Sequence, residues 1–217
     1  MPNSVLSLLL TCVALLIPSL NALAQQNDPP KPERLITLHL SKATIISVAT
    51  TLAVDQNVPV GLQLTSSGNN EANIDIDVRN VPLTDVLNLI VQQTGSYAWE
   101  YRDGVINFYP VRDADPFFAK LLDTRVAQFR PRSNDKFVIR DAVLDSSEVK
   151  KLMASENVTA DRLGYPYRAS VHANNADLSA ENIDVRSLLN KIIRESEHNF
   201  YLLGWTQKDK REFEIGF

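Results

Sequence analysis

The sequence is poor in the residues that most often build reactive sites. It has one cysteine, three histidines and seven glycines among 217 residues. The cysteine, Cys12, lies inside an apolar N-terminal run, so a chain that has lost this run can form neither a disulfide nor a thiolate zinc site. Lipidation of Cys12 is not expected, because Thr11 precedes it and apolar residues follow. A domain without disulfides depends on its hydrophobic core, and about 190 residues are enough to build one.

Excess positive charge is also lacking. The formal net charge is -4 and the pI is about 5.4, so the chain has no overall basic footprint for nucleic acid. Hydrophobic residues make up 44% and charged residues 22%, which is typical of globular proteins. We therefore predict a folded protein with no nucleic-acid partner.

The longest apolar run, Val5 to Ile17, is short for a bilayer span, which needs about 20 apolar residues. Ala22-Leu23-Ala24 gives the small-x-small signature of a signal peptide cleaved after Ala24. We predict a periplasmic or secreted protein with a signal peptide over residues 1–24 and a proline-rich linker over 25–34. No Lys or Arg precedes the apolar run, so an uncleaved anchor is the alternative.

Residues 35–111 contain a strand–helix–strand pattern that occurs twice. Alternation predicts a strand over 35–40, a helix begins after Ser41, and a second strand covers 60–64. The pattern restarts with a strand over 74–78 and a helix from Pro82 to Gly95, and a hairpin over 97–109 turns at Asp103-Gly104. Such split units normally pack their helices on one face of a small mixed sheet.

The second half, residues 112–217, is less regular. Asp115-Pro116 opens a helix with apolar residues through Val126, and residues 136–144 favour a strand. Ser146 or Ser147 caps a helix through Met153. Residues 154–173 carry no clear pattern, apart from a turn at Tyr165-Pro166-Tyr167. A charged turn over 207–211 precedes a last strand over 212–217.

Residues 182–193 echo residues 80–91, with Asn, Leu, Asn and Ile at matching positions. Both stretches lead into an aromatic strand, Tyr97-Ala98-Trp99 in one half and Phe200-Tyr201-Leu202 in the other. This indicates a weak internal duplication; the alternative is that any two amphipathic helices entered from a strand look alike. We predict an α+β fold of small mixed sheets with helices on one face, in two related subdomains, 35–111 and 112–217.

A family resemblance covers about a third of the chain. The residues that carry it are Leu38-His39-Leu40, Val48 to Leu52, Ile74 to Val78, Asn80-Val81-Pro82-Leu83-Thr84-Asp85-Val86-Leu87, and Tyr97 to Phe108. In this order they resemble the short N-terminal domain shared by secretins and some TonB-dependent receptors. The resemblance implies a periplasmic domain that binds other envelope proteins, in a free-standing version because no pore sequence follows. It implies no catalytic residues.

The histidines and acids form no recognisable reactive pattern. His39, His172 and His198 lack the spacing of metal ligands, so no metal site is expected. The carboxylate pairs are Asp75/Asp77, Asp113/Asp115 and Asp141/Asp145. A glycosidase needs two acids facing one cleft, whereas these pairs indicate a solvated strand face, a linker and a helix entry.

Nucleophile and phosphate motifs are missing as well. The sequence has no Gly-x-Ser-x-Gly elbow and no glycine-rich phosphate loop, and Arg130 and Arg132 lie in a loop that we expect to be solvated. We therefore predict no catalytic residues, no cofactor and no small-molecule substrate.

We predict a non-catalytic exported interaction module of the bacterial cell envelope. A protein partner would bind an exposed sheet edge or a helix groove. The candidate edges are the Tyr97–Tyr109 hairpin and the Glu212–Phe217 strand. One alternative is a hydrolase or carbohydrate-acting enzyme whose acids converge only in three dimensions. Another is a structural part of a secretion or pilus machine. The sequence leaves the oligomeric state open.

Overall fold

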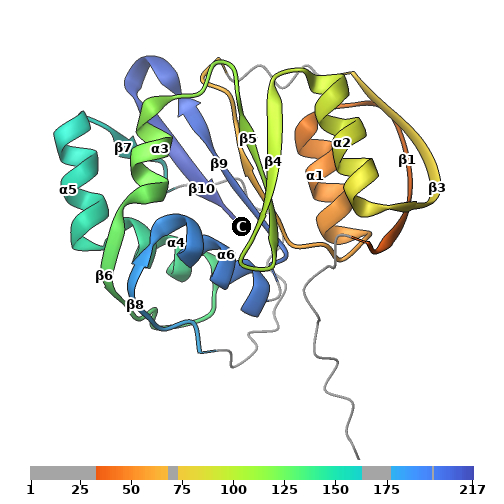
Figure 1. The fold of residues 1–217 in the computed structure, drawn as a ribbon. Helices are drawn as coiled ribbons and strands as arrows, with labels where there is room; N and C mark the ends of the chain where they lie inside the picture. The colour runs from red at the N-terminus through yellow and green to blue at the C-terminus, as the bar shows by residue number, and fades with distance from the viewer. Residues whose placement is uncertain (1–32, 68–72, 163–176, 197) are drawn as a thin grey trace, which may run out of the picture.

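The fold is taken from a computed structural model, which describes residues 33–67, 73–162, 177–196 and 198–217 (Figure 1). The predicted signal peptide, the linker up to residue 32 and the Tyr165-Pro166-Tyr167 turn lie outside these ranges. Within them, no helix combines the length and the apolar character that a membrane crossing requires.

The first half has the predicted order of elements. They are β1 (Leu35–Ala43), α1 (Ile45–Val54), β2 (Val60–Gln63), β3 (Ile74–Pro82), α2 (Leu83–Thr94), β4 (Tyr97–Arg102) and β5 (Val105–Pro110). The N-cap of α1 is Thr44 rather than Ser41, because β1 runs on to Ala43 and the Thr44 hydroxyl accepts the Ser47 amide. Gly95 ends α2 in the left-handed conformation, as predicted.

The second half differs from the prediction at two segments that the sequence had assigned. Its elements are α3 (Pro116–Asp123), β6 (Arg125–Phe129), α4 (Lys136–Leu144), α5 (Ser147–Glu156), β7 (Thr159–Ala160), β8 (Ala180–Asp184), α6 (Val185–Glu195), β9 (Phe200–Gln207) and β10 (Glu212–Gly216). The strand predicted over 136–144 is wrong, because this segment is helix α4. The Asp135 carboxylate caps it by accepting the amides of Phe137 and Val138, and Ile139 and Val143 are buried one turn apart.

The other difference concerns Val126, which was predicted to lie on the helix that starts at Pro116. That helix ends at Asp123, and the extended backbone of Thr124 leads into β6. Val126 is fully buried on β6 opposite Ile183 of β8. A buried apolar residue one turn beyond a helix is therefore a poor guide to where the helix stops.

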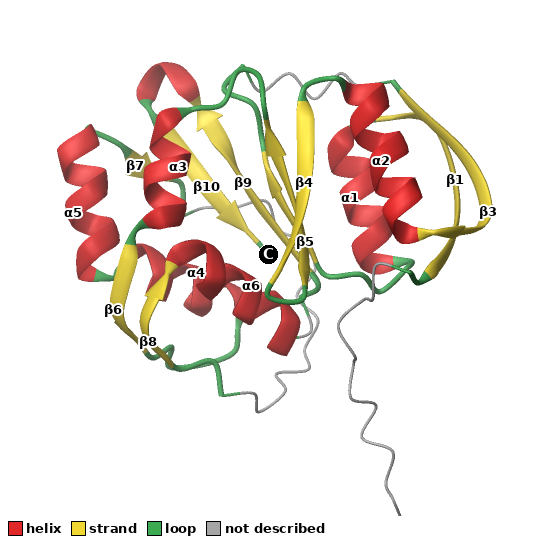
Figure 2. Cartoon of the chain, viewed as in Figure 1, coloured by secondary structure: helices red, strands yellow, loops and turns green. Residues whose placement is uncertain are grey.

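The two halves share one mixed sheet (Figure 2). Helices packed with strands in mixed sheets confirm the predicted α+β class. Six strands lie in the order β4-β5-β2-β9-β10-β7, and β2 of the first half runs parallel to β9 of the second. Two small antiparallel sheets, β1-β3 and β6-β8, complete the fold.

The strand order repeats between the halves. In each half a three-stranded piece has the same pairings, β4-β5-β2 in the first and β9-β10-β7 in the second, with one antiparallel and one parallel contact. Asn80 and Asn182, which the sequence echo had matched, both have positive φ, and so do Asn57 and Asn157 ahead of β2 and β7. Helices α3 and α4 have no counterpart in the first half. The topology therefore supports the duplication that the sequence indicated.

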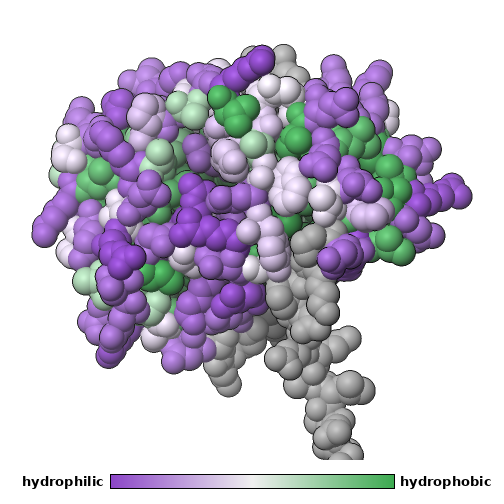
Figure 3. Space-filling view, in the orientation of Figure 1, coloured by the Kyte–Doolittle hydropathy of each residue, from purple (hydrophilic) through white to green (hydrophobic). Residues whose placement is uncertain are grey.

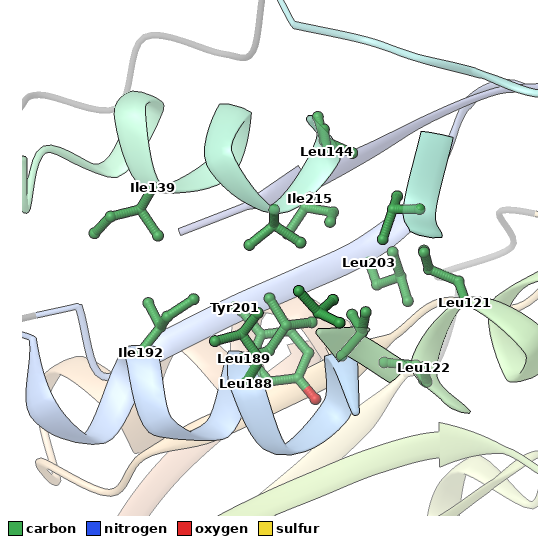
Figure 4. Close-up of a cluster of buried hydrophobic side chains, with 14 of the residues drawn as sticks. Leu121, Leu122, Ile139, Leu144, Leu188, Leu189, Ile192, Tyr201, Leu203 and Ile215 are labelled. Atoms are coloured by element: carbon green, nitrogen blue, oxygen red, sulfur yellow. The ribbon is translucent and has the colours of Figure 1, made fainter. Parts of the chain in front are cut away.

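Each half packs its helices on a different face of the six-stranded sheet. Helices α1 and α2 lie between this sheet and β1-β3, whereas α3 to α6 lie on the opposite side (Figure 1). Strand β5 serves both cores, because Ile106 and Phe108 point into the first and Val105 into the second. Figure 4 shows the second core, where Leu188 and Leu189 of α6 meet the β9 side chains. Both faces of the central strands β5 and β9 thus pack against a hydrophobic core.

Candidate interaction edge

Strand β4 ends the six-stranded sheet on one side. A two-residue turn, Asp103-Gly104, closes its hairpin on the pair Arg102–Val105. Such a turn closes on a hydrogen-bonded pair, and hydrogen-bonded pairs alternate along an antiparallel ladder. The Val111 amide, which donates to the Ser96 carbonyl, fits this parity. The backbone groups of the odd-numbered residues of β4 therefore point outward; these residues are Tyr97, Trp99 and Tyr101.

We call these outward N–H and C=O groups the β4 edge. Across the described part of the chain, no strand pairs with them and no other backbone group bonds to them. Tyr101 is the most exposed residue of the strand, at 37%. In Figures 1 and 2, β4 lies at the front of the sheet with no strand before it. An unpaired edge of this kind is a template for an added strand.

The counterpart of this edge in the second half is occupied. The separation that relates Asn80 to Asn182 also relates Trp99 to Tyr201, so β9 corresponds to β4. The outer groups of β9 bind β2: the amides of Val60 and Leu64 donate to the carbonyls of Asn199 and Leu203, each at 2.8 Å. The chain itself therefore performs strand addition at one of its two equivalent edges.

The occupied edge depends on a glycine. Gly61 of β2 pairs with Tyr201 of β9, and a Cβ atom at Gly61 would lie 2.3 Å from the Tyr201 ring. The Tyr201 hydroxyl donates to Asn107 Oδ1 at 2.6 Å, and both side chains are buried. Burial raises the pKa of Tyr201 far above its ordinary value, so the phenol stays protonated and keeps donating.

Helix α6 of the second half supports β4 from behind. Arg102 Nη2 lies 3.2 Å from Asp184 Oδ2, and Arg186 Nη1 lies 3.4 Å from Glu100 Oε1. The buried Asn190 amide donates to the Arg102 carbonyl at 3.2 Å. These contacts hold the even-numbered side chains of β4 against α6, so the second half positions the free edge of the first.

On its other face β4 carries aromatic side chains. The Trp99 indole donates to Asn88 Oδ1 of α2 at 3.1 Å and packs against the first core. Tyr101 follows on the same face. The view in Figure 3 shows apolar residues in small separate groups among polar ones. Backbone groups beside aromatic rings, rather than one large apolar patch, therefore characterise this edge.

The histidines do not converge. His39 lies on the exposed side of β1, where its ring bonds to Asp77 across the strand pair. His198 follows α6 with its ring 6.2 Å from that of Phe217, and His172 lies outside the described residues. In the ranges that the structure covers, no three acid, histidine or cysteine side chains form a group able to hold a metal ion.

The acids of the first two predicted carboxylate pairs form hydrogen bonds with different parts of the chain. Asp75 and Asp77 lie on the exposed face of β3, as predicted. The Lys42 amide and the Ser41 hydroxyl donate to Asp75, which lowers its pKa. Asp115 caps α3 and also accepts the Trp205 indole at 3.1 Å.

The third pair and Arg130, one of the two loop arginines, form surface ion pairs. Asp141 lies on α4, and Asp145 is the C-cap of α4 and directly precedes Ser146, the N-cap of α5, which is the helix entry predicted for this pair. Asp145 contacts Arg162 at 2.8 Å. The hydrogen bond from Arg162 is the largest cause of the lowered pKa of Asp145. Arg130 pairs with Glu181 at 3.1 Å, and Arg132 is exposed.

One carboxyl that the sequence did not single out, that of Glu214, has a raised pKa. Glu214 of β10 is partly buried, and this burial, followed by the charge of Asp161, raises its pKa. The charge of Arg140 acts to lower the pKa of Glu214. Alternation along β10 could have placed Glu214 opposite the buried Phe213, but nothing in the sequence brought Asp161 near it.

The second candidate edge does not hold along its whole length. The last strand, β10, pairs with β7 through Glu212 and Phe213, so its first residues lie inside the sheet. The hairpin, in contrast, supplies the outermost strand. Of the two predicted edges, β4 is the one with a full row of unpaired backbone groups.

No protein-family model, curated protein or solved structure matches the chain. The likeness of residues 35–110 to the short N-terminal domain of secretins and TonB-dependent receptors thus stays a prediction.

Proposed function

We propose that the chain is a non-catalytic, exported interaction module of the bacterial cell envelope that binds a protein partner by strand addition at the β4 edge. One observation carries the proposal. The equivalent edge on β9 already binds a strand, β2, while the β4 edge has no strand neighbour among the described residues. Strand addition gives affinity through backbone hydrogen bonds and specificity through alternate side chains.

The cellular part of the proposal rests on the sequence. The Ala22-Leu23-Ala24 signature supports export, and the resemblance of residues 35–110 supports a place among envelope proteins. N-terminal sequencing of the chain from the cell envelope tests the first point. It should read from Gln25. A chain that keeps Met1 in the envelope would contradict cleavage after Ala24, and a chain that stays in the cytoplasm would contradict export.

Photo-crosslinking in the native cell tests the binding edge. A photoreactive phenylalanine derivative replaces Tyr101 in one variant and Val54, which is 71% exposed at the end of α1, in a control. We expect an adduct with an envelope protein from position 101 and none from position 54. Equal adducts from both positions, or none from position 101, would contradict the proposal.

A hydrolase remains the second candidate because of Glu214. A carboxyl with a raised pKa can act as a general acid, and the Asp161 charge contributes to the raised pKa. Chromogenic glycosides and esters test this, with Glu214→Gln as the matched variant. Turnover that Glu214→Gln abolishes would favour catalysis; turnover equal in both proteins, or none, would count against it.

A further inference from the structure

We infer that the partner of the β4 edge is an extended protein segment that runs parallel to β4 and places a small side chain opposite Trp99. The inference rests on the proposed function and specifies the chemistry of the partner. Its template is the contact of β2 with β9, where the direction, the register and the size of the facing residue are all visible.

The direction follows from the repeat. Strand β2 runs parallel to β9, with Val60 opposite Phe200 and Gly61 opposite Tyr201. The outward groups of β9 and β4 occupy equivalent positions, since Asn199, Tyr201 and Leu203 match Tyr97, Trp99 and Tyr101 by one constant separation. A strand that copies the β2 contact therefore runs parallel to β4.

The size requirement follows from the ring. Tyr201 leaves no room for a Cβ at Gly61, because that atom would approach the ring to 2.3 Å. At the equivalent position Trp99 carries a larger ring, which its hydrogen bond to Asn88 holds on the α2 side. A passing segment therefore needs glycine or another very small residue beside Trp99.

The neighbouring residues of the segment meet a different surface. On β9 the even-numbered side chains Phe200 and Leu202 are apolar and pack against the first core. On β4 the corresponding side chain is Glu100, which pairs with Arg186 of α6. We therefore expect the residues that flank the small one to carry hydroxyl or amide groups, because a large apolar side chain would lie against these charges.

A second copy of this chain does not meet these requirements. The strand that corresponds to β2 in the second half is β7, which spans only two residues. Asn57 and Asn157 align β2 with β7, and this alignment places Asp161 where β2 has Gly61. A carboxylate beside Trp99 is neither small nor suited to the adjacent ring. The segment thus belongs to another protein.

A designed peptide tests the inference on the full chain. The probe is a fluorescein-labelled copy of residues 59–64 in which Val60→Thr and Leu62→Thr supply the polar flanks. A control probe adds Gly61→Val. Binding is followed by fluorescence polarisation, and a spin label at the N-terminus of the unlabelled probe reports direction by NMR.

We expect saturable binding of the probe and binding at least about tenfold weaker for the Gly61→Val probe. Tyr101→Pro removes one outward amide and should weaken binding about tenfold, the equivalent of one hydrogen bond, whereas Tyr101→Ala keeps the amide and should change binding by less than about threefold. An NMR spectrum of each variant verifies that it is folded. The spin label should broaden the Tyr97 amide rather than that of Arg102.

Any of three results with the probes would overturn the inference: no binding of the probe, equal binding of both probes, or broadening at Arg102. If position 101 still crosslinks to an envelope protein in the cell, the inference alone fails and the proposed function stands. Concentration-dependent dimers that Tyr101→Pro dissolves would assign the edge to a second copy and would also overturn it.

Discussion

The edges of β9 and β4 that face away from their hairpin partners are equivalent in topology. The edge of β9 is paired with β2, whereas that of β4 has no strand neighbour among the described residues. On β9 the side chains that face the other half, Phe200 and Leu202, are apolar and lie against the first core. On β4 the matching side chains are Ala98 and Glu100, and Glu100 forms an ion pair. Apolar side chains at the even-numbered positions thus accompany the edge that the chain covers with its own strand, and a charged one accompanies the edge that has no strand neighbour among the described residues. Charge at an edge keeps it from pairing indiscriminately.

The largest expected effect comes from breaking the occupied edge. Gly61→Ala forces a Cβ into the Tyr201 ring and should lower the free energy of unfolding by about 3 kcal/mol, the upper part of the range for overpacked cores. Urea unfolding measures it. Gly216→Ala is the control, because its Cβ would lie 3.7 Å from the nearest atom. Equal losses for both variants would mean that the close approach at β9 does not define that edge.

The next prediction compares a residue that caps a helix and also supports β4 with a residue that only caps a helix. Asp184→Ala removes the cap of α6 and the ion pair with Arg102, so it should cost about 1–2 kcal/mol and weaken probe binding. Asp135→Ala removes the cap of α4, which does not contact β4 in this way, and should cost a similar amount with binding unchanged. Chemical unfolding and polarisation titrations give the two readouts. Weaker binding in both variants would show that stability alone sets affinity.

The smallest expected effect concerns two matching positions, one on β5 and one on β10. Ile106 pairs with Val60 and Phe213 pairs with Ala160, so the next residues, Asn107 and Glu214, correspond. Asn107 is neutral and bonded to Tyr201, whereas Glu214 is a partly buried acid with a raised pKa.

Because the folded state binds the Glu214 proton more tightly than the unfolded state, this residue costs stability as pH rises from about 4.5 through the raised pKa. Glu214→Gln should therefore melt at a higher temperature than wild type at about pH 7, and the gap should close below about pH 4. Thermal denaturation at both pH values measures it. A gap that stays constant with pH would rule out ionisation as the cause.

The sequence was most informative where local chemistry decides the structure. The Asp103-Gly104 pair predicted the hairpin, and Gly95 predicted the end of α2. The likeness of the sequences around Asn80 and Asn182 predicted the repeat. The sequence failed at α4, whose apolar residues also suit an alternating strand and whose cap lies one residue before the segment assigned. The pairing of β2 with β9 joins residues far apart in the chain, and no local pattern encodes such a contact.

The most direct test of the two-edge account is amide hydrogen exchange, residue by residue, along β4 and β9. In the free chain the amides of Tyr201 and Leu203 should be protected by β2, whereas those of Trp99 and Tyr101 should exchange rapidly. Saturation with the probe peptide should slow Trp99 and Tyr101 and leave Tyr201 unchanged. Protection of Trp99 and Tyr101 in the free chain, or their continued rapid exchange at saturation, would contradict the claim that β4 is the open docking edge.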